Sequence, residues 1–150
     1  MAQAIELTEN VEMYLKYIYL LSQQNRETAK TGEISYYLKV APSSVTEMLE
    51  RLQKDKYVKY KKYQGAALTK KGENVAVKIL RRHCTMEYFL VDLGVPAGRS
   101  HDEACEMEHV LSDDTTRRLQ KTIDWPKSCP DCYDLSRLHC RYLNGKIAKN

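Results

Sequence analysis

The side chains best suited to chemistry lie in the second half of the sequence, where metal-binding residue types recur at helical spacing. His83 and Glu87 are four residues apart, so they share one face of a helix. A second stretch adds four donors at successive turns: His101, Cys105, Glu108 and His109. Imidazole, thiolate and carboxylate groups together suit a transition ion rather than Mg²⁺ or Ca²⁺. These six donors on neighbouring helices predict a metal centre, whereas a lone histidine would not.

Three helices are expected to position these donors. Apolar spacing predicts a long helix over residues 70–93, capped by Thr69, and two more over residues 99–111 and 113–123. On the helix over residues 99–111 the donors form one stripe. A second stripe of Ala104, Met107 and Leu111 is expected to face the core. Cys84, in the middle of the first of these helices, is expected to be a small buried apolar residue.

The first half of the chain has a different order of elements. A helix is predicted from Thr8 to about residue 23, a short helix after Thr31, and a third helix that has Pro42 in its first turn. Two strands follow, over residues 57–61 and 66–68, joined by a turn at Gln64 and Gly65. This order predicts an N-terminal winged helix-turn-helix, within a mostly α-helical protein.

Charge is distributed unevenly along the chain. Residues 53–71 carry seven lysines and one acidic residue, whereas residues 99–114 carry six acidic residues and one arginine. The first segment suits a polyanion and the second a cation. Small polar residues at the start of the third helix can approach bases and phosphates. The predicted DNA-binding residues therefore include Ser43, Ser44, Glu47, Arg51, Lys59, Lys61 and Lys62. The alternative is a helical domain whose hairpin binds another protein.

Length and composition exclude several classes of protein. The 150 residues allow one compact domain or two small ones, and no apolar run approaches the roughly 18 residues of a transmembrane helix. The first residues do not resemble a signal peptide, so we expect a cytoplasmic protein with reduced cysteines and no membrane partner. The chain lacks the zinc-deaminase signature and a glycine-rich phosphate loop. We therefore expect neither enzyme activity nor a small-molecule substrate.

The C-terminal tail, residues 126–150, contains a second group of metal-binding side chains. Cys129 and Cys132 form a CxxC pair, and His139 and Cys140 follow. This spacing provides half of a zinc site, which one of the two later residues could extend. An iron–sulfur cluster, a redox couple and unligated thiols are the alternatives. A helix is predicted from Asp134 to about residue 143.

The chain resembles the diphtheria-toxin-repressor family of metal-dependent transcriptional repressors, in a short two-domain form. The resemblance covers roughly residues 8–123. The segments on which the resemblance rests are Thr8–Leu15 (TENVEMYL), Pro42–Thr46 (PSSVT), Leu68–Gly72 (LTKKG), Arg82–His83 with Glu87, and His101–His109 (HDEACEMEH). The resemblance implies a primary regulatory site of Met13, Cys105, Glu108 and His109. It also implies an ancillary site of His83, Glu87 and His101, and recognition of DNA through Ser43, Ser44 and Thr46.

The family has iron- and manganese-responsive branches, and three positions distinguish them. The manganese branch has carboxylates where this chain has Met13 and Cys105, and a further acid where it has Lys16. Softer ligands favour ferrous iron, with manganese as the alternative. The chain is also too short for the third, β-barrel domain of longer members, which supplies further ancillary ligands.

The resemblance implies a homodimer on a palindromic double-stranded operator. It divides the chain into a DNA-binding domain (residues 1–72), a dimerisation and metal-binding domain (73–125) and the cysteine-containing tail. We hypothesise that metal links the helix of Met13 to the second half and so selects the form that binds DNA. A regulator that senses oxidation through the tail, and a metal-dependent enzyme, are the competing hypotheses.

Overall fold

The computed structural model describes residues 3–25, 27–123, 133–135 and 139–140, and these divide into two compact units. The first unit is Met1–Val77 and the second is Lys78–Asn150. The predicted domain boundary after residue 72 falls inside a long helix, α4, that begins at Lys70 and ends at Asp92.

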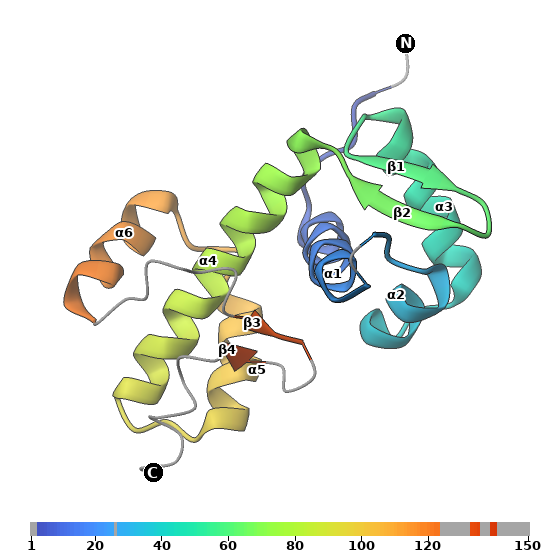
Figure 1. The fold of residues 1–150 in the computed structure, drawn as a ribbon. Helices are drawn as coiled ribbons and strands as arrows, with labels where there is room; N and C mark the ends of the chain where they lie inside the picture. Colours follow the sequence, from blue (N-terminus) through green and yellow to red (C-terminus); the bar gives the residue numbers. More distant parts are fainter. Residues whose placement is uncertain (1–2, 26, 124–132, 136–138, 141–150) are drawn as a thin grey trace. The chain divides into compact units, whose positions relative to one another are not determined.

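Three helices form the core of the first unit (Figure 1). They are α1 (Glu9–Asn25), α2 (Thr31–Leu38) and α3 (Pro42–Lys54). Thr8 precedes α1 and accepts a hydrogen bond from the Val11 amide through Oγ1 at 3.4 Å, as expected of an N-cap. Lys39 adopts a left-handed conformation (φ 55°) and ends α2. Pro42 occupies the first turn of α3, where its missing N–H costs no hydrogen bond.

The core of this unit uses the apolar stripe that the helical spacing predicts. The buried side chains of α3 are Val45, Met48, Leu49 and Leu52. Ile34 of α2 and Leu15 and Ile18 of α1 are fully buried as well. In α3 these residues recur every three or four positions, so the helix turns one face inward and leaves the opposite face exposed. Helix α1 is instead buried on every side from Tyr14 to Leu21, because it lies in the middle of the unit.

A short antiparallel hairpin completes the winged helix-turn-helix. Strand β1 (Val58–Lys61) pairs with β2 (Gly65–Leu68), with Val58 opposite Leu68 and Lys61 opposite Gly65. Gly65 has a φ of +103°, a conformation that side chains disfavour, so the tight turn depends on glycine here. The chain before α2 also joins the hairpin, because Ala29 and Ala66 exchange backbone hydrogen bonds of 2.8 and 2.9 Å.

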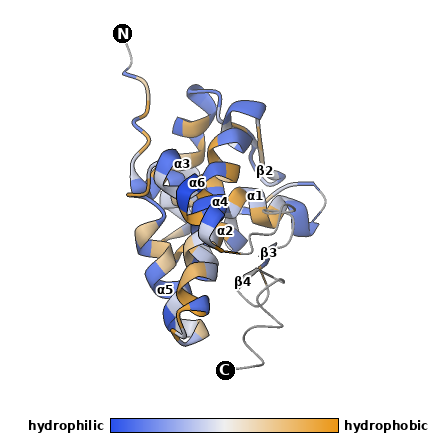
Figure 2. Cartoon of the chain, turned by 90° about the vertical axis from the view of Figure 1, so that its left-hand side faces the viewer, coloured by the Kyte–Doolittle hydropathy of each residue, from blue (hydrophilic) through white to orange (hydrophobic). Residues whose placement is uncertain are grey.

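The second unit contains the greater part of α4 together with α5 (Ala97–Met107) and α6 (Asp113–Thr122). Ser112 caps α6 by accepting a hydrogen bond from the Thr115 amide at 3.1 Å. Arg82 of α4 donates to Asp113 at 2.9 Å, which ties the start of α6 to α4. Hydrophilic and hydrophobic segments alternate along α5 in Figure 2, the pattern of a helix with one buried face.

Two expectations for this unit are wrong. The tail was expected to be helical from Asp134, but its described residues form a strand pair, with β3 (Tyr133–Asp134) antiparallel to β4 (His139–Cys140). Met107 was expected in the core, yet it is 37% exposed, whereas Ala104 of the same stripe is fully buried. The reason for the second difference is that α5 ends at Met107, so the stripe is not continued by helical residues. Cys84 is buried, as expected.

The sequence contains no apolar run long enough for a transmembrane helix, and the described helices were compared with that requirement. Among the described helices, none has both the length and the apolar composition that spanning a bilayer requires.

Candidate metal centre and DNA-binding surface

The centre of the predicted metal cluster is His83, a fully buried histidine on α4. Its Nδ1 lies 2.6 Å from Glu108 Oε2, and its Nε2 lies 2.7 Å from Glu87 Oε2. Glu87 is one helical turn further along α4, so the spacing of four residues places it on the same face. Both carboxylates are 0–1% exposed. A single imidazole therefore joins two carboxylates inside the unit, a costly arrangement unless all the partners are satisfied.

Two residues of α5 complete the cluster. Cys105 Sγ lies 3.5 Å from His101 Nε2 and 3.8 Å from His83 Nδ1. The ligand atoms of His83, His101 and Cys105 all lie within 4.8 Å of one another. The rings of the two histidines meet edge to face with centroids 5.0 Å apart. Helical spacing on α5 produces this arrangement, because His101 and Cys105 are four residues apart and face α4 together.

Neighbouring groups shift the pKa values of two cluster residues in opposite directions. Burial alone would raise the pKa of the Glu87 carboxyl, but His101 and His83 outweigh burial and lower that pKa. Burial alone would lower the pKa of His101, but the neighbouring Cys105 and Glu87 outweigh it and raise that pKa to about 9. The His101 Nδ1 to Glu87 Oε2 distance is 3.5 Å.

Glu108 and His109 lie after the C-terminal end of α5, although they were expected to lie within that helix. Because α5 ends at Met107, Glu108 is its C-cap residue and His109 lies in the turn that follows. The Glu108 carboxylate nevertheless points inward to His83, and His109 Nε2 lies 3.4 Å from its other oxygen. The structure thus places four of the other predicted donors beside His83, namely Glu87, His101, Cys105 and Glu108, and His109 beside Glu108. The part of each in holding metal stays a prediction.

The sequence did not predict that Tyr133 would join this cluster. Its ring meets the ring of His83 edge to face, with centroids 5.6 Å apart, and its side chain is buried. Tyr133 belongs to β3, in a segment where a helix had been expected to start at the next residue. No spacing rule connects residues 50 positions apart, so only the tertiary structure reveals this contact.

Two predicted groups cannot be placed in this cluster. Met13 lies on α1 in the first unit and is partly buried, and its predicted part in the primary site stays a prediction. Cys129 and Cys132 lie outside the described residues. His139 and Cys140 form β4, but the structure describes only their backbone. The predicted metal site of the tail is therefore untested.

The predicted DNA-binding residues lie on the surface of the first unit. Most of them are exposed, and Thr46 alone of the set is partly buried. The exposed members are Ser43, Ser44, Glu47 and Arg51 on α3 and Lys59, Lys61 and Lys62 on the hairpin. Their exposure follows from the same periodicity that buries the opposite face of α3.

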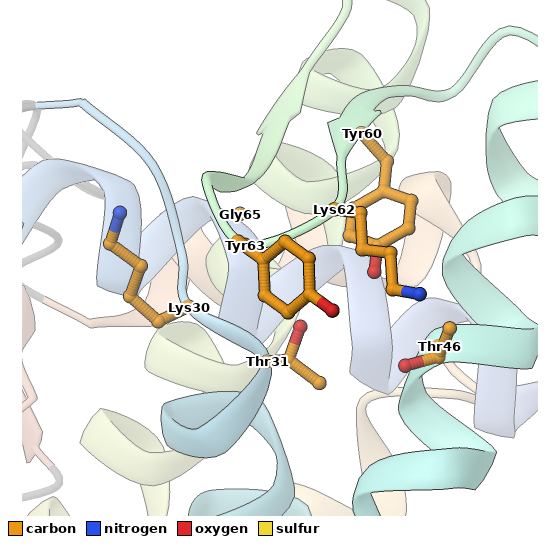
Figure 3. A pocket seen from close by; sticks show the side chains of 7 residues that line it. All are labelled: Lys30, Thr31, Thr46, Tyr60, Lys62, Tyr63 and Gly65. Atoms are coloured by element: carbon orange, nitrogen blue, oxygen red, sulfur yellow. The ribbon is translucent and has the colours of Figure 1, made fainter.

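An open pocket of about 270 Å³ lies between the hairpin, the start of α2 and α3. Figure 3 shows the hydroxyl groups of Thr31 and Tyr63 pointing into the space that Thr46 borders from α3. Tyr63, at the hairpin turn, is 91% exposed, and the Lys62 ammonium lies 5.3 Å from its ring centroid. A tyrosine next to a lysine in a cationic hairpin is the sequence signal that could have indicated this pocket. Thr46 and Lys62 were predicted here from the sequence, whereas four other lining residues were not: Lys30, Thr31, Tyr60 and Tyr63.

The two units therefore define a class of protein: a winged helix-turn-helix joined in one chain to a buried cluster of transition-metal donors. Residues 6–66 match the family described as iron dependent repressor, N-terminal DNA binding domain. Residues 69–134 match iron dependent repressor, metal binding and dimerisation domain. The chain belongs to this family of metal-dependent transcriptional repressors, to which the diphtheria-toxin repressor and MntR types belong, and which consists of regulators rather than enzymes.

Individual relatives agree with this assignment. An uncharacterised HTH-type transcriptional regulator of Methanocaldococcus jannaschii is 41% identical over 115 residues, which is 76% of this chain and 92% of that protein. The HTH-type transcriptional regulator MntR of Lysinibacillus sphaericus is 36% identical over 124 residues, 83% of this chain and 88% of that protein. The solved manganese regulator SloR matches with a TM-score of 0.68 and 36% identity over 83% of this chain. The match spans 58% of the SloR chain.

Proposed function

We propose that this repressor responds to ferrous iron and, when loaded, binds a palindromic operator as a homodimer in the cytoplasm. The observation that carries the proposal is the partly buried Cys105 thiol, 3.5 Å from His101 Nε2, in a cluster that also contains carboxylates. Sulfur and nitrogen donors favour Fe(II) over Mn(II), whereas oxygen donors favour Mn(II). Relatives named as manganese regulators make Mn(II) the competing ion.

The donor set fits a divalent transition ion for a physical reason. Two buried carboxylates, Glu87 and Glu108, surround one imidazole, and a thiol and a second imidazole lie beside them. A bound divalent ion supplies positive charge that offsets the buried carboxylates and the thiolate. Cys105, Glu108 and His109 lie within five positions of one another along the chain, so an ion bound by all three would act directly on the end of α5.

The first unit provides the surface for DNA. The exposed side of α3 carries small polar residues at its N-terminus, where backbone N–H groups favour phosphate. Lysines of the hairpin add affinity that is independent of sequence and sensitive to salt. Glu47 can accept from a cytosine amino group, and Arg51 can reach a base or a phosphate.

The second unit exposes large apolar side chains that could contact a second copy of the chain. Val110 and Leu93 are 82% and 66% exposed, and Met107 is exposed as well. Exposed apolar side chains of this size suit an interface between protomers. A twofold dimer would present two recognition helices about 34 Å apart along the duplex, which is why a palindromic operator is expected.

The test is operator binding by the full chain with different ions under anaerobic conditions. An operator is first selected from random duplexes with Fe(II)-loaded protein, and binding is then measured with Fe(II), Mn(II), Zn(II) or chelator. We expect tight binding with Fe(II), weaker binding with Mn(II) and loss of specific binding with chelator. Replacing Cys105 by glutamate (Cys105→Glu) should shift the preference toward Mn(II), because a carboxylate is the harder ligand.

Cys84→Ser is the matched control, because Cys84 is also a cysteine of the second unit but is not among the predicted donors. Its ion preference should stay that of the parent. Equal operator binding with and without ions would disprove metal dependence. Preference for Mn(II) in the parent, unchanged by Cys105→Glu, would disprove the iron assignment and leave the family assignment intact.

A further inference from the structure

The imidazole of His83 is buried among groups from two kinds of element. Glu87 and His101 belong to the helices α4 and α5, and Glu108 is the C-cap residue of α5. Tyr133 belongs instead to β3, in the tail, and its ring meets the imidazole edge to face, with centroids 5.6 Å apart and planes 74° apart. The tail therefore reaches the predicted donors themselves.

The described segment around Tyr133 is packed against the rest of the chain. Tyr133 is 8% exposed, and Leu135, which follows β3, is 6% exposed. With these residues in place, His83 is 0% exposed. Any ion that reaches or leaves this imidazole therefore requires a neighbouring element to move aside.

The elements next to His83 differ in what it costs to move them. Helices α4 and α5 have 23 and 11 residues, and successive turns are held by backbone hydrogen bonds. Strands β3 and β4 have two residues each, and they pair only through Tyr133 with Cys140 and Asp134 with His139. A two-stranded pair is marginally stable by itself, and local opening starts in elements with few such bonds. Opening of β3–β4 is therefore the least costly way to expose His83.

We infer that the β3–β4 strand pair is a gate for the regulatory ion, and that the ring of Tyr133 closes this gate over His83. The inference rests on the proposed function, because it requires the cluster around His83 to hold the ion. It concerns the tail rather than the ligands, since it assigns to the tail the control of how fast the ion enters and leaves.

A gate has a kinetic signature that a purely stabilising contact lacks. The same opening precedes entry and exit, so a weaker closed state raises both rate constants by similar factors and changes the affinity little. A residue that only stabilised the loaded form would slow exit alone, and its removal would raise the dissociation constant in proportion. The role of Tyr133 is therefore tested through rates together with affinity.

The probe is Mn(II), which prefers oxygen and nitrogen donors and so avoids the cysteine thiols of the tail. The Mn(II)-loaded full chain is mixed with excess calcein, and quenching of calcein by captured Mn(II) gives the dissociation rate constant. A rate that is independent of calcein concentration confirms that release is being measured. The dissociation constant comes from titration followed by the electron paramagnetic resonance of free Mn(II). The two values together give the association rate constant.

Replacing the ring tests the gate directly. Tyr133→Ala should raise both rate constants about tenfold or more and change the dissociation constant by less than about threefold. Tyr133→Phe should keep the rates of the parent, because a phenylalanine ring preserves the edge-to-face contact with His83. Rates in Tyr133→Phe that match those of Tyr133→Ala would overturn the role of the ring.

Thr85→Ala is the matched control in the same helix. Thr85 is buried and accepts a hydrogen bond from Gln120 of α6 at 3.0 Å. It lies two residues from His83, so it faces the opposite side of α4. Its loss disturbs the packing of α4 without touching the gate, and the rates should stay those of the parent. Unchanged rates in Tyr133→Ala, or faster exit with unchanged entry, would overturn the inference and leave the proposed function intact.

Hydrogen exchange of the metal-free full chain tests the gate without an ion and without a substitution. The backbone amides of β3 should exchange faster than those of α4 from His83 to Glu87, because the strand pair opens before the helix does. Equal protection of the two segments would overturn the inference. A parent chain that binds no Mn(II) would overturn the inference and the metal dependence of the proposed function together. None of these measurements uses DNA, so a failure of operator binding does not affect them.

Discussion

The two units of this chain place their charged and polar functional groups in opposite environments. In the first, the predicted DNA-binding side chains of α3 and the hairpin are exposed to solvent, with Thr46 partly buried. In the second, His83, Glu87 and Glu108 are 0–1% exposed, and the imidazole lies 2.6–2.7 Å from each carboxylate. The exposed lysines suit a large anion that is attracted from a distance, whereas the buried donors suit a small ion that fits among a few atoms.

This difference has energetic consequences. Exposed lysines act through a screened field, so their number matters more than their positions, and salt weakens them. Buried groups act at short range, where each must be compensated and where small displacements are costly. Substitutions in the predicted metal cluster should therefore strongly affect stability. Substitutions in the hairpin should instead affect DNA affinity and leave stability almost unchanged.

The largest effect is expected for His83→Leu. Removing the imidazole leaves Glu87 and Glu108 buried without the group that joins them, and breaking such a buried pair costs about 3–5 kcal/mol of unfolding free energy. Urea unfolding of the metal-free protein, followed by circular dichroism, measures the change. Arg51→Ala, an exposed change in the other unit, should stay within about 0.5 kcal/mol. Equal costs for the two variants would contradict the comparison.

The next effect is on DNA affinity. Replacing Lys59, Lys61 and Lys62 by alanine should weaken operator binding and leave the unfolding free energy almost unchanged. The slope of log affinity against log salt should become shallower by about 0.9 for each phosphate that is no longer neutralised, so by roughly 2–3 in total. Fluorescence anisotropy across a salt series provides this slope. Lys121→Ala, an exposed lysine of α6, should leave the slope unchanged; a steeper or unaltered slope in the triple variant would disprove the assignment.

A pair of helical glycines tests packing in the two units. A Cβ at Gly72 would collide with the backbone oxygen of Tyr57, so Gly72→Ala should cost about 1–3 kcal/mol. A Cβ at Gly98, near the start of α5, would meet no atom within 4 Å, so Gly98→Ala should stabilise by about 0.4–1 kcal/mol. Thermal unfolding of both variants checks the signs. A neutral Gly72→Ala would show that the start of α4 can shift freely.

The smallest effect is expected for the ion pair between the partly buried Arg82 and the exposed Asp113 of the second unit. The hydrogen bond from Arg82 lowers the pKa of Asp113, so its stabilising contribution is present above the ordinary aspartate pKa and is lost as the pH falls through the lowered value. Asp113→Asn should therefore cost about 0.2–1 kcal/mol at pH 7 and less near pH 3. Unfolding curves at both pH values measure this. A free energy of unfolding at pH 7 that is the same in Asp113→Asn and in the parent would contradict the contribution of this ion pair.

Most elements were predictable because local patterns specify them. Thr8, Pro42 and Thr69 mark the starts of α1, α3 and α4, and apolar spacing selects the buried faces. The end of α5 was less predictable, since the amphipathic pattern continues to residue 111 while the helix stops at Met107. The strand pair of the tail was not predictable, because strand pairing there depends on residues that are not adjacent in sequence.

The sequence by itself determined which donors exist and which of them share a helix face, because a residue spacing of four converts directly into proximity on one helix. It determined the positive hairpin in the same way, since charge is a property of composition. Only the tertiary structure decided which ring nitrogen of each histidine meets sulfur and which meets a carboxylate. It also decided that Glu108 turns inward after α5 and that Tyr133 joins His83. These interactions join separate elements, and their geometry depends on how the elements pack rather than on any spacing along the chain.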